Sequence, residues 1–347
     1  MIPFPAVDLE LAVSLATSIE WRSLAGKRVF LTGGTGFVGK WLLASLIEAR
    51  RLHDFECEVV VLSRNPANFR LQSQYLTDAP GVRMLQGDVR DFELPTERFD
   101  VVVHAATDVA IGAPPLATFD TCVTGTRRVL DAAVRAGARD FLLVSSGAVY
   151  GRQPPALPAF PEDFVGAPAT MDPRAGYGHG KRAAEWLCSA WGAEFGLRVV
   201  TARLFAFVGP GIALDGPFAV ASFLRDAIAD RPIVIQGDGT PLRSYLHAAE
   251  MTGWLWRLMF RGCPGQAYNV GGEDPVSIAE LARRVASAAG SKSGVEVRGL
   301  AATGLASDRY VPDVGKAHRE LGLRPGLTLD ESLQRTVSWL RVAGTHL

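Results

Sequence analysis

Three residues whose side chains could carry out chemistry together follow one another along the chain. Ser146 ends an apolar stretch typical of a buried strand, and Tyr177 and Lys181 come later, within a helical pattern. Residues four apart share one face of a helix, so the Lys181 ammonium can lie beneath the Tyr177 phenol. A free tyrosine has a pKa of about 10, and a neighbouring cation lowers it. We therefore predict that Tyr177 exchanges a proton with a substrate oxygen that Ser146 holds.

A glycine-rich turn is the first element that must position these groups. It follows the apolar run Val29–Leu31 and leads into a helical pattern that starts at Lys40. Such a turn lets a pyrophosphate approach the main chain, and the free N–H groups at the helix start attract the anion. We therefore predict a dinucleotide site whose contacts come from Gly33, Thr35, Gly36, Phe37, Val38 and Gly39.

Alternating apolar runs and helical patterns indicate the fold. Further strands are predicted at Glu58–Ser63, Val82–Gln86, Asp100–His104, Asp140–Ser145 and Arg198–Leu204, and helices at Thr124–Ala136 and Tyr177–Phe195. This order favours an α/β fold with a Rossmann-like, doubly wound parallel sheet. We expect a helical extension at 1–26, a dinucleotide-binding domain with the catalytic residues at 27–206, and a smaller α/β substrate-binding lobe at 207–347. That lobe, with short strands at Ile233–Ile235 and Tyr268–Val270 and helices at Val276–Ala289 and Leu329–Val342, is expected to be partly interwoven with the first domain.

Ligands gather at the carboxyl ends of parallel strands, which extends the predicted cofactor site. Beyond the turn it comprises Ser63, Arg64, Asp88, Val89, His104, Ala105, Ala106, Tyr177 and Lys181. An acidic residue commonly meets the ribose after the second strand, but here Arg64 can pair with a 2′-phosphate. We therefore favour NADP and keep NAD open, and the alternative is that Arg64 stacks on adenine or faces solvent. The charge of an oxidised nicotinamide would also favour the Tyr177 phenolate.

Composition limits the possible partners. The 36 Lys and Arg residues balance 36 Asp and Glu residues, so no global field draws the chain to nucleic acid or to an anionic membrane. The four cysteines show no metal-ligand spacing, and we predict neither a metal site nor disulfides. Without a convincing signal peptide or a long apolar span, we expect a soluble, cytoplasmic protein. Apolar residues on both faces of the helix at 177–195 predict a homodimer.

The whole chain resembles the extended short-chain dehydrogenase/reductase family, in its NAD(P)-dependent nucleotide-sugar epimerase, dehydratase and reductase branch. The resemblance covers about residues 27–340 and is carried by the segments 32–39, 87–89, 104–106, 145–151, 177–181, 237–245 and 309–317. It implies a nucleoside diphosphate sugar substrate. It also implies that Arg243 and Arg309 grip the diphosphate, since guanidinium forks suit phosphate oxygens. The alternative is two surface arginines in salt bridges.

Departures from the family pattern narrow the expected reaction. The 4,6-dehydratases of this branch carry an Asp-Glu pair where this chain has Gly147 and Ala148, and the 3,5-epimerising reductases have a cysteine at the second position. We therefore expect NADPH-dependent reduction of a 4-keto-6-deoxy sugar nucleotide, with a 4-epimerase that keeps its NAD(P) as the closest alternative. A 4,6-dehydratase, a small-ketone reductase and a non-catalytic dinucleotide sensor are less favoured.

Overall fold

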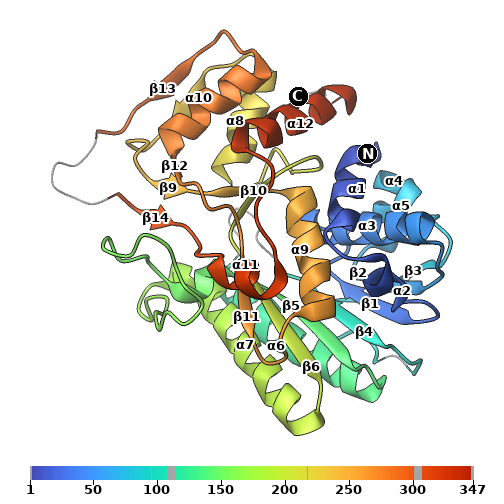
Figure 1. The fold of residues 1–347 in the computed structure, drawn as a ribbon. Coiled ribbons are helices and arrows are strands. Elements are labelled where there is room, and N and C mark those ends of the chain that lie inside the picture. Colours follow the sequence, from blue (N-terminus) through green and yellow to red (C-terminus); the bar gives the residue numbers. More distant parts are fainter. Residues whose placement is uncertain (1, 95, 108–113, 217, 301–306, 345–347) are drawn as a thin grey trace.

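A seven-stranded parallel sheet organises the structure, a computed structural model that describes residues 2–94, 96–107, 114–216, 218–300 and 307–344 (Figure 1). Across the sheet the strand order is β11-β6-β5-β4-β1-β2-β3. These strands are β1 (Arg28–Thr32), β2 (Glu58–Ser63), β3 (Val82–Gln86), β4 (Val101–His104), β5 (Asp140–Ser146), β6 (Arg198–Leu204) and β11 (Ala267–Val270). The order reverses between β1 and β4, and ligands of such open sheets bind at the carboxyl ends of the strands beside the reversal.

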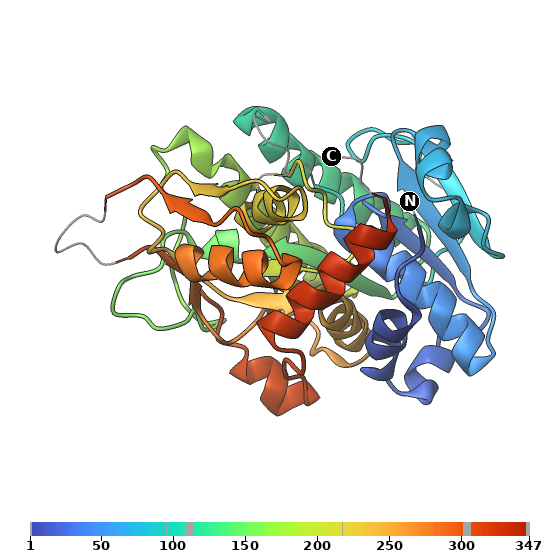
Figure 2. The same ribbon diagram turned by 90° about the horizontal axis from the view of Figure 1, so that it is seen from above.

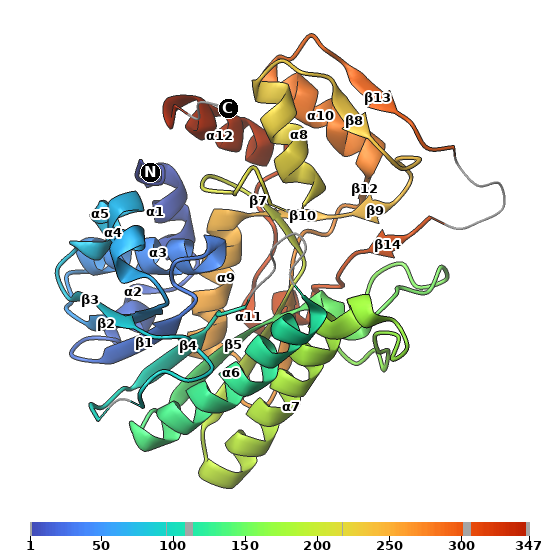
Figure 3. The same cartoon turned by 180° about the vertical axis from the view of Figure 1, so that it is seen from behind.

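Helices cover both faces of the sheet (Figures 1 and 3). One face carries α6 (Pro115–Arg135) and α7 (Gly176–Phe195) side by side, and the other carries α3 (Phe37–His53) and α9 (Ala248–Arg261). Successive strand residues point to opposite faces. Accordingly, Val29 and Leu31 of β1 pack in the cluster that contains α3 and α9, and Phe30 packs in the cluster of α6 and α7. Burial on both sides explains why these strands are continuous apolar runs.

A smaller lobe lies over the carboxyl end of β5. Its strands are β7 (Ala206–Val208), β8 (Ile233–Ile235), β9 (Leu242–Arg243), β10 (Tyr245–His247), β12 (Val276–Ser277), β13 (Val295–Val297) and β14 (Arg309–Tyr310). Its helices are α8 (Ala219–Ile228), α10 (Ile278–Ala289) and α12 (Leu329–Val342), whereas α11 (Gly315–Leu321) lies beside β11 and α9 at the main sheet. The other elements are α1 (Ala6–Ser14), α2 (Ser18–Arg22), α4 (Pro66–Gln72), α5 (Gln74–Thr77) and the short 3₁₀ turns η1 (Gly147–Tyr150) and η2 (Pro173–Ala175).

The predicted fold class is confirmed, with local differences. Helix α6 begins at Pro115 rather than at Thr124, because its small residues pack closely on α7: a Cβ on Gly180 of α7 would lie 2.8 Å from the Cβ of Cys122. The predicted helix at 276–289 begins at Ile278, since Ser277 caps it by accepting the N–H of Glu280 at 3.1 Å. In the described ranges, no helix has the length and apolar character needed to cross a membrane.

The N-terminal extension links the two parts of the molecule (Figure 2). Phe4 stacks on Trp41 of α3, with ring centroids 4.2 Å apart, and its ring also lies 6.3 Å from that of Trp339 on α12. The buried carboxylate of Asp8 in α1 forms an ion pair of 2.5 Å with Arg335 of α12. The extension therefore contacts both the sheet-covering helix that follows the glycine turn and the smaller lobe.

Candidate active site

The glycine turn between β1 and α3 is a tight main-chain cradle. Gly33 has a φ of +70°, and a Cβ there would lie 2.5 Å from the carbonyl of Ala105 at the end of β4. A Cβ on Gly39 would lie 2.2 Å from the carbonyl oxygen of Gly33. Gly36 is exposed and starts α3 without a side-chain cap, and no acidic residue lies in the first helical turn. These features fit a pyrophosphate, which would bind the free N–H groups at this helix start.

Two predicted cofactor residues at the neighbouring strand ends have protein partners. Ser63, at the end of β2, is buried, and its Oγ accepts the N–H of Asn65 at 3.2 Å. The Asp88 carboxylate binds the Arg90 guanidinium, with Oδ1 to Nε at 2.8 Å, and this bond holds the pKa of Asp88 below its usual range. Arg64 is exposed and close enough to Asp88 to contribute to that lowering.

His104 is buried between strands and does not offer its ring to a ligand. Its Nδ1 lies 2.7 Å from Oγ1 of Thr32, and its Nε2 lies 2.9 Å from Oγ1 of Thr126. Burial, reinforced by the Lys181 charge, lowers its pKa to about 3. The imidazole therefore stays neutral and joins β1, β4 and α6, with both nitrogens engaged within the protein.

The structure brings Ser146, Tyr177 and Lys181 together. Ser146 ends β5, and its side chain lies close enough to the Tyr177 phenol, in the first turn of α7, to act against the effect of burial on the pKa of that phenol. Lys181 is buried: its Nζ donates to the carbonyl of Val144 at 2.9 Å and lies 5.9 Å from the centre of the Tyr177 ring. Burial raises the pKa of Tyr177 to about 12, the opposite of the direction predicted from its spacing to Lys181. Burial also lowers the pKa of Lys181. Because the pKa of Tyr177 is raised, its phenol is neutral at pH 7 when no cofactor is bound.

A second tyrosine, Tyr310 on β14, completes this hydroxyl cluster. Burial raises the pKa of its phenol and nearby Ser146 lowers it, and a Cβ on Gly147 would lie 2.6 Å from its hydroxyl oxygen. Its ring packs 4.6 Å from that of Phe205. We had not predicted this residue, although it lies in the segment that carries Arg309. The sequence offered one indication, because Tyr310 directly follows Arg309, which we predict to bind the substrate.

The two predicted diphosphate ligands have different surroundings. The Arg243 guanidinium lies 5.8 Å from the centre of the Tyr310 ring and pairs with Asp308 at 2.7 Å. Arg309 instead donates to the carbonyl of Pro158 at 3.0 Å. Strands β9 and β14 run parallel with Tyr310 opposite Arg243, and successive residues face opposite sides. The structure therefore brings Arg243, and not Arg309, to the hydroxyl cluster, and a role in diphosphate binding stays a prediction for both.

Comparison with known proteins identifies the family. The model of the NAD dependent epimerase/dehydratase family matches residues 29–271, most of the chain. The chain belongs to this family. The predicted membership of the extended short-chain dehydrogenase/reductase group is thereby confirmed, and the chain is an enzyme of that group.

Individual relatives of this epimerase/dehydratase family member catalyse different reactions. UDP-glucuronic acid decarboxylase 1 of Arabidopsis thaliana is 30% identical over 317 residues, which cover 90% of this chain and 70% of the relative. The epimerase Mth375 of Methanothermobacter thermautotrophicus superposes with a TM-score of 0.79 at 24% identity, over 94% of this chain and 95% of that one. DesIV of Streptomyces venezuelae, a dTDP-glucose 4,6-dehydratase with NAD and TYD bound, gives 0.77 at 27% identity, over 91% and 97%. None of these names describes the 4-keto reduction that we expected.

Proposed function

We propose that this chain is a nucleotide-sugar 4-epimerase. The proposal rests on one observation, the cluster of Ser146, Tyr177 and Tyr310 hydroxyls beside the Lys181 ammonium. Among the residues that the structure describes, those that affect the pKa of Tyr177, besides burial, are Ser146 and Cys122, and neither is a carboxylate. A hydroxyl and an ammonium can move a proton to and from a sugar 4-hydroxyl, whereas removal of water across C5 and C6 needs a further acid or base. Gly147 and Ala148 supply neither.

The roles of the residues follow from their positions. A nicotinamide dinucleotide bound at the glycine turn supplies the hydride acceptor and donor. Ser146 holds the sugar oxygen, and Tyr177 takes its proton and later returns it. Because burial raises the pKa of Tyr177 to about 12, the phenol needs positive charge nearby to ionise. Lys181 and an oxidised nicotinamide carry such charge, so we infer that Tyr177 becomes a base only when the cofactor is in place.

The reductase that we first expected remains a second candidate, because Arg64 follows β2 at the place where a 2′-phosphate would lie. NADP suits an enzyme that releases its cofactor after each turnover, whereas the solved relative DesIV holds NAD. The two reactions differ in stoichiometry. A reductase consumes one added NADPH per product, and an epimerase turns over with none added.

The test is product analysis by proton NMR with UDP-glucose, UDP-glucuronic acid and dTDP-glucose, without added cofactor. We expect one of them to give its 4-epimer, and Tyr177→Phe to lower turnover by about a hundredfold or more, the usual contribution of a positioned acid-base group. Tyr75→Phe is the matched control, because it removes a buried phenol from α5, outside the cluster. Release of CO₂ from UDP-glucuronic acid, or turnover only with added NADPH, would contradict the epimerase proposal.

We also propose that the chain forms a homodimer through α6 and α7. The exposed apolar side chains on these helices include Trp186, with 68% of its surface accessible, and Leu116, with 84%. Large apolar residues that gather on neighbouring helices mark interaction surfaces. Light scattering after size exclusion should give twice the chain mass, and Trp186→Glu should give a monomer. A monomeric wild-type chain would refute this.

A further inference from the structure

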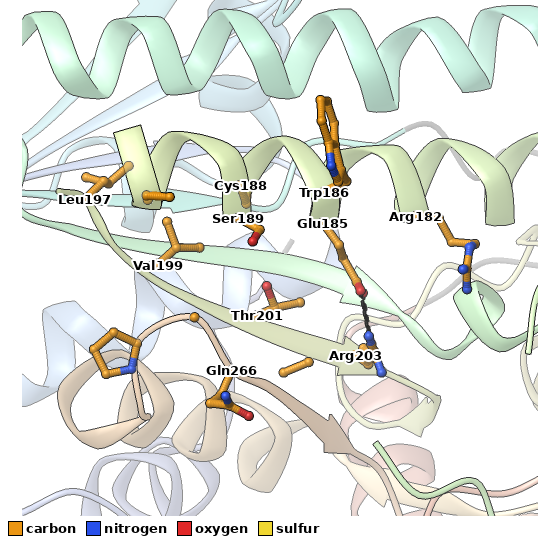
Figure 4. A pocket seen from close by; sticks show the side chains of 15 residues that line it. Arg182, Glu185, Trp186, Cys188, Ser189, Leu197, Val199, Thr201, Arg203 and Gln266 are labelled. Atoms are coloured by element: carbon orange, nitrogen blue, oxygen red, sulfur yellow. Dashed lines mark hydrogen bonds and ion pairs between the residues drawn. The ribbon is translucent and has the colours of Figure 1, made fainter. Parts of the chain in front are cut away.

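A largely buried ion pair joins α7 to β6 and plays no part in the chemistry described above (Figure 4). Glu185 stands on α7 one turn after Lys181, and Arg203 stands on β6. Arg203 Nη2 donates to Oε2 of Glu185 at 2.8 Å, and its Nε donates to Oε1 at 3.0 Å. Only 15% of each side chain is exposed, so solvent and salt screen the pair weakly.

The pair hydrogen-bonds to the side chains of residues that precede and follow Ser146 in the sequence. The Glu185 carboxylate accepts a hydrogen bond of 2.6 Å from the hydroxyl of Ser145, the residue just before Ser146. Arg203 Nη1 donates to the hydroxyl of Tyr150 at 2.8 Å, at the end of the η1 turn that follows Ser146. One ion pair therefore joins β5, η1 and β6 to the helix that carries Tyr177 and Lys181.

The ion pair also borders a cavity. Both residues line a cavity of about 590 Å³ between α7, β6 and the segment Pro264–Ala267 (Figure 4). Thr201 and Gln266 are among the other residues lining it, and the dashed line in the figure joins Glu185 to Arg203. On this side of the sheet the hydrogen bonds of the pair supplement the apolar packing of β5 on α7, which includes Leu143 and Ala184.

We propose that Glu185 and Arg203 are positioning residues, which keep Ser146 within hydrogen-bonding reach of Tyr177. Their polar atoms bond to protein groups rather than facing the hydroxyl cluster, so they act through Ser145, Tyr150 and α7. The inference rests on the proposed epimerase function, because it assigns the pair to the geometry of that site. A displacement of about 1 Å between reacting groups can lower a rate about a hundredfold.

Glu185→Gln is the first test, since it keeps the shape of the side chain and removes its charge. We expect kcat to fall about tenfold or more, with KM and bound cofactor within about twofold of wild type, because neither ligand touches Glu185. Glu20→Gln is the matched control. Glu20 is similarly buried, at 4% exposure, and its Oε2 lies 2.6 Å from Nη1 of Arg257, but it belongs to the N-terminal extension. It should lower Tm comparably and leave kcat unchanged.

Two further variants separate positioning from simple loss of stability. A single change leaves an unpaired buried charge, so Glu185→Gln with Arg203→Gln should recover part of the lost Tm. It should not recover kcat, because the charge-assisted bonds to Ser145 and Tyr150 stay weakened. Ser145→Ala removes only the 2.6 Å bond to Glu185 and should lower kcat about fivefold with Tm near wild type.

The outcomes are distinct. Wild-type kcat in Glu185→Gln or in Ser145→Ala, or recovery of kcat together with Tm in the double variant, would overturn the positioning role and leave the epimerase proposal intact. A wild-type enzyme that turns over no nucleotide sugar would instead remove the proposed function, and the positioning role with it.

Discussion

Replacing Tyr310 by phenylalanine removes one oxygen atom from the hydroxyl cluster and leaves the ring in place. A serine hydroxyl accepts two hydrogen bonds and donates one. Ser146 Oγ already accepts the N–H of Ala148 at 3.1 Å, and the phenols of Tyr177 and Tyr310 lie near enough for Ser146 to affect the pKa of each. We therefore expect a sugar oxygen that binds Ser146 to displace one of these phenol oxygens. Tyr177 sits beside Lys181, so Tyr310 is the phenol that gives way.

The size of the effect follows from one exchanged hydrogen bond. Such a bond contributes about 1 kcal/mol net, which corresponds to about a fivefold change in a dissociation constant. We expect Tyr310→Phe to bind UDP-glucose about fivefold more tightly than wild type, because the sugar oxygen no longer has to displace the phenol oxygen of Tyr310. UDP, which lacks the sugar, should bind both proteins equally. Burial raises the pKa of Tyr310, so the difference should be the same from about pH 6 to 9.

Isothermal titration calorimetry with UDP-glucose and with UDP tests this prediction. The control is Tyr75→Phe, which loses a buried phenol that has no hydrogen-bond partner. Equal or weaker binding of UDP-glucose by Tyr310→Phe would show that the phenol does not occupy the place of the sugar oxygen. Equal tightening of UDP would show a general opening of the site. Either result refutes the reasoning.

Three further predictions concern the cofactor and stability. Gly39→Ala should weaken dinucleotide binding at least about tenfold in a fluorescence titration, because its Cβ would lie 2.2 Å from the carbonyl oxygen of Gly33 and the turn must shift; wild-type affinity would contradict this. Arg64→Ala should weaken NADP about tenfold and leave NAD unchanged, if Arg64 meets the 2′-phosphate. Burial lowers the pKa of His104 and of His247 to about 3 each in the folded protein. As the pH falls below about 6.5, both histidines therefore bind protons in the unfolded state but not in the folded state. Each histidine should therefore lower the free energy of unfolding by about 2 kcal/mol between pH 7 and pH 5. A urea unfolding midpoint that does not fall over this pH range would contradict the prediction.

Local sequence patterns predicted most of the large sheet, because parallel strands buried on both faces are continuous apolar runs. They could not show where β11 belongs. Ala267–Val270 lies in the C-terminal half of the sequence, yet it pairs with β6 at the edge of the main sheet. Partners of a strand are chosen by contacts distant in sequence, and no local pattern records them. The start of α6 was missed for a related reason, since close packing on α7 rather than apolar periodicity specifies that part of the helix.

The candidate site was predictable where its members are linked by secondary structure. Helical spacing joins Tyr177 to Lys181, and the end of a strand presents Ser146. Tyr310 was missed because only the tertiary fold brings β14 to β5. The pKa of Tyr177 was predicted in the wrong direction, since the spacing shows the neighbouring cation but not the burial that outweighs it. The neutral, doubly bonded state of His104 likewise depends on two threonines from separate elements.

The ion pair between Asp8 and Arg335 has a consequence for how the chain matures during translation. Its members are 327 residues apart, and ribosomes add roughly 5–20 residues per second, so α1 exists for tens of seconds before α12 is made. Throughout that interval the carboxylate of Asp8 lacks its guanidinium, and Phe4 lacks the indole of Trp339. A nascent chain therefore keeps the apolar surface around Phe4 uncovered, and accessible to chaperones, until α12 has emerged.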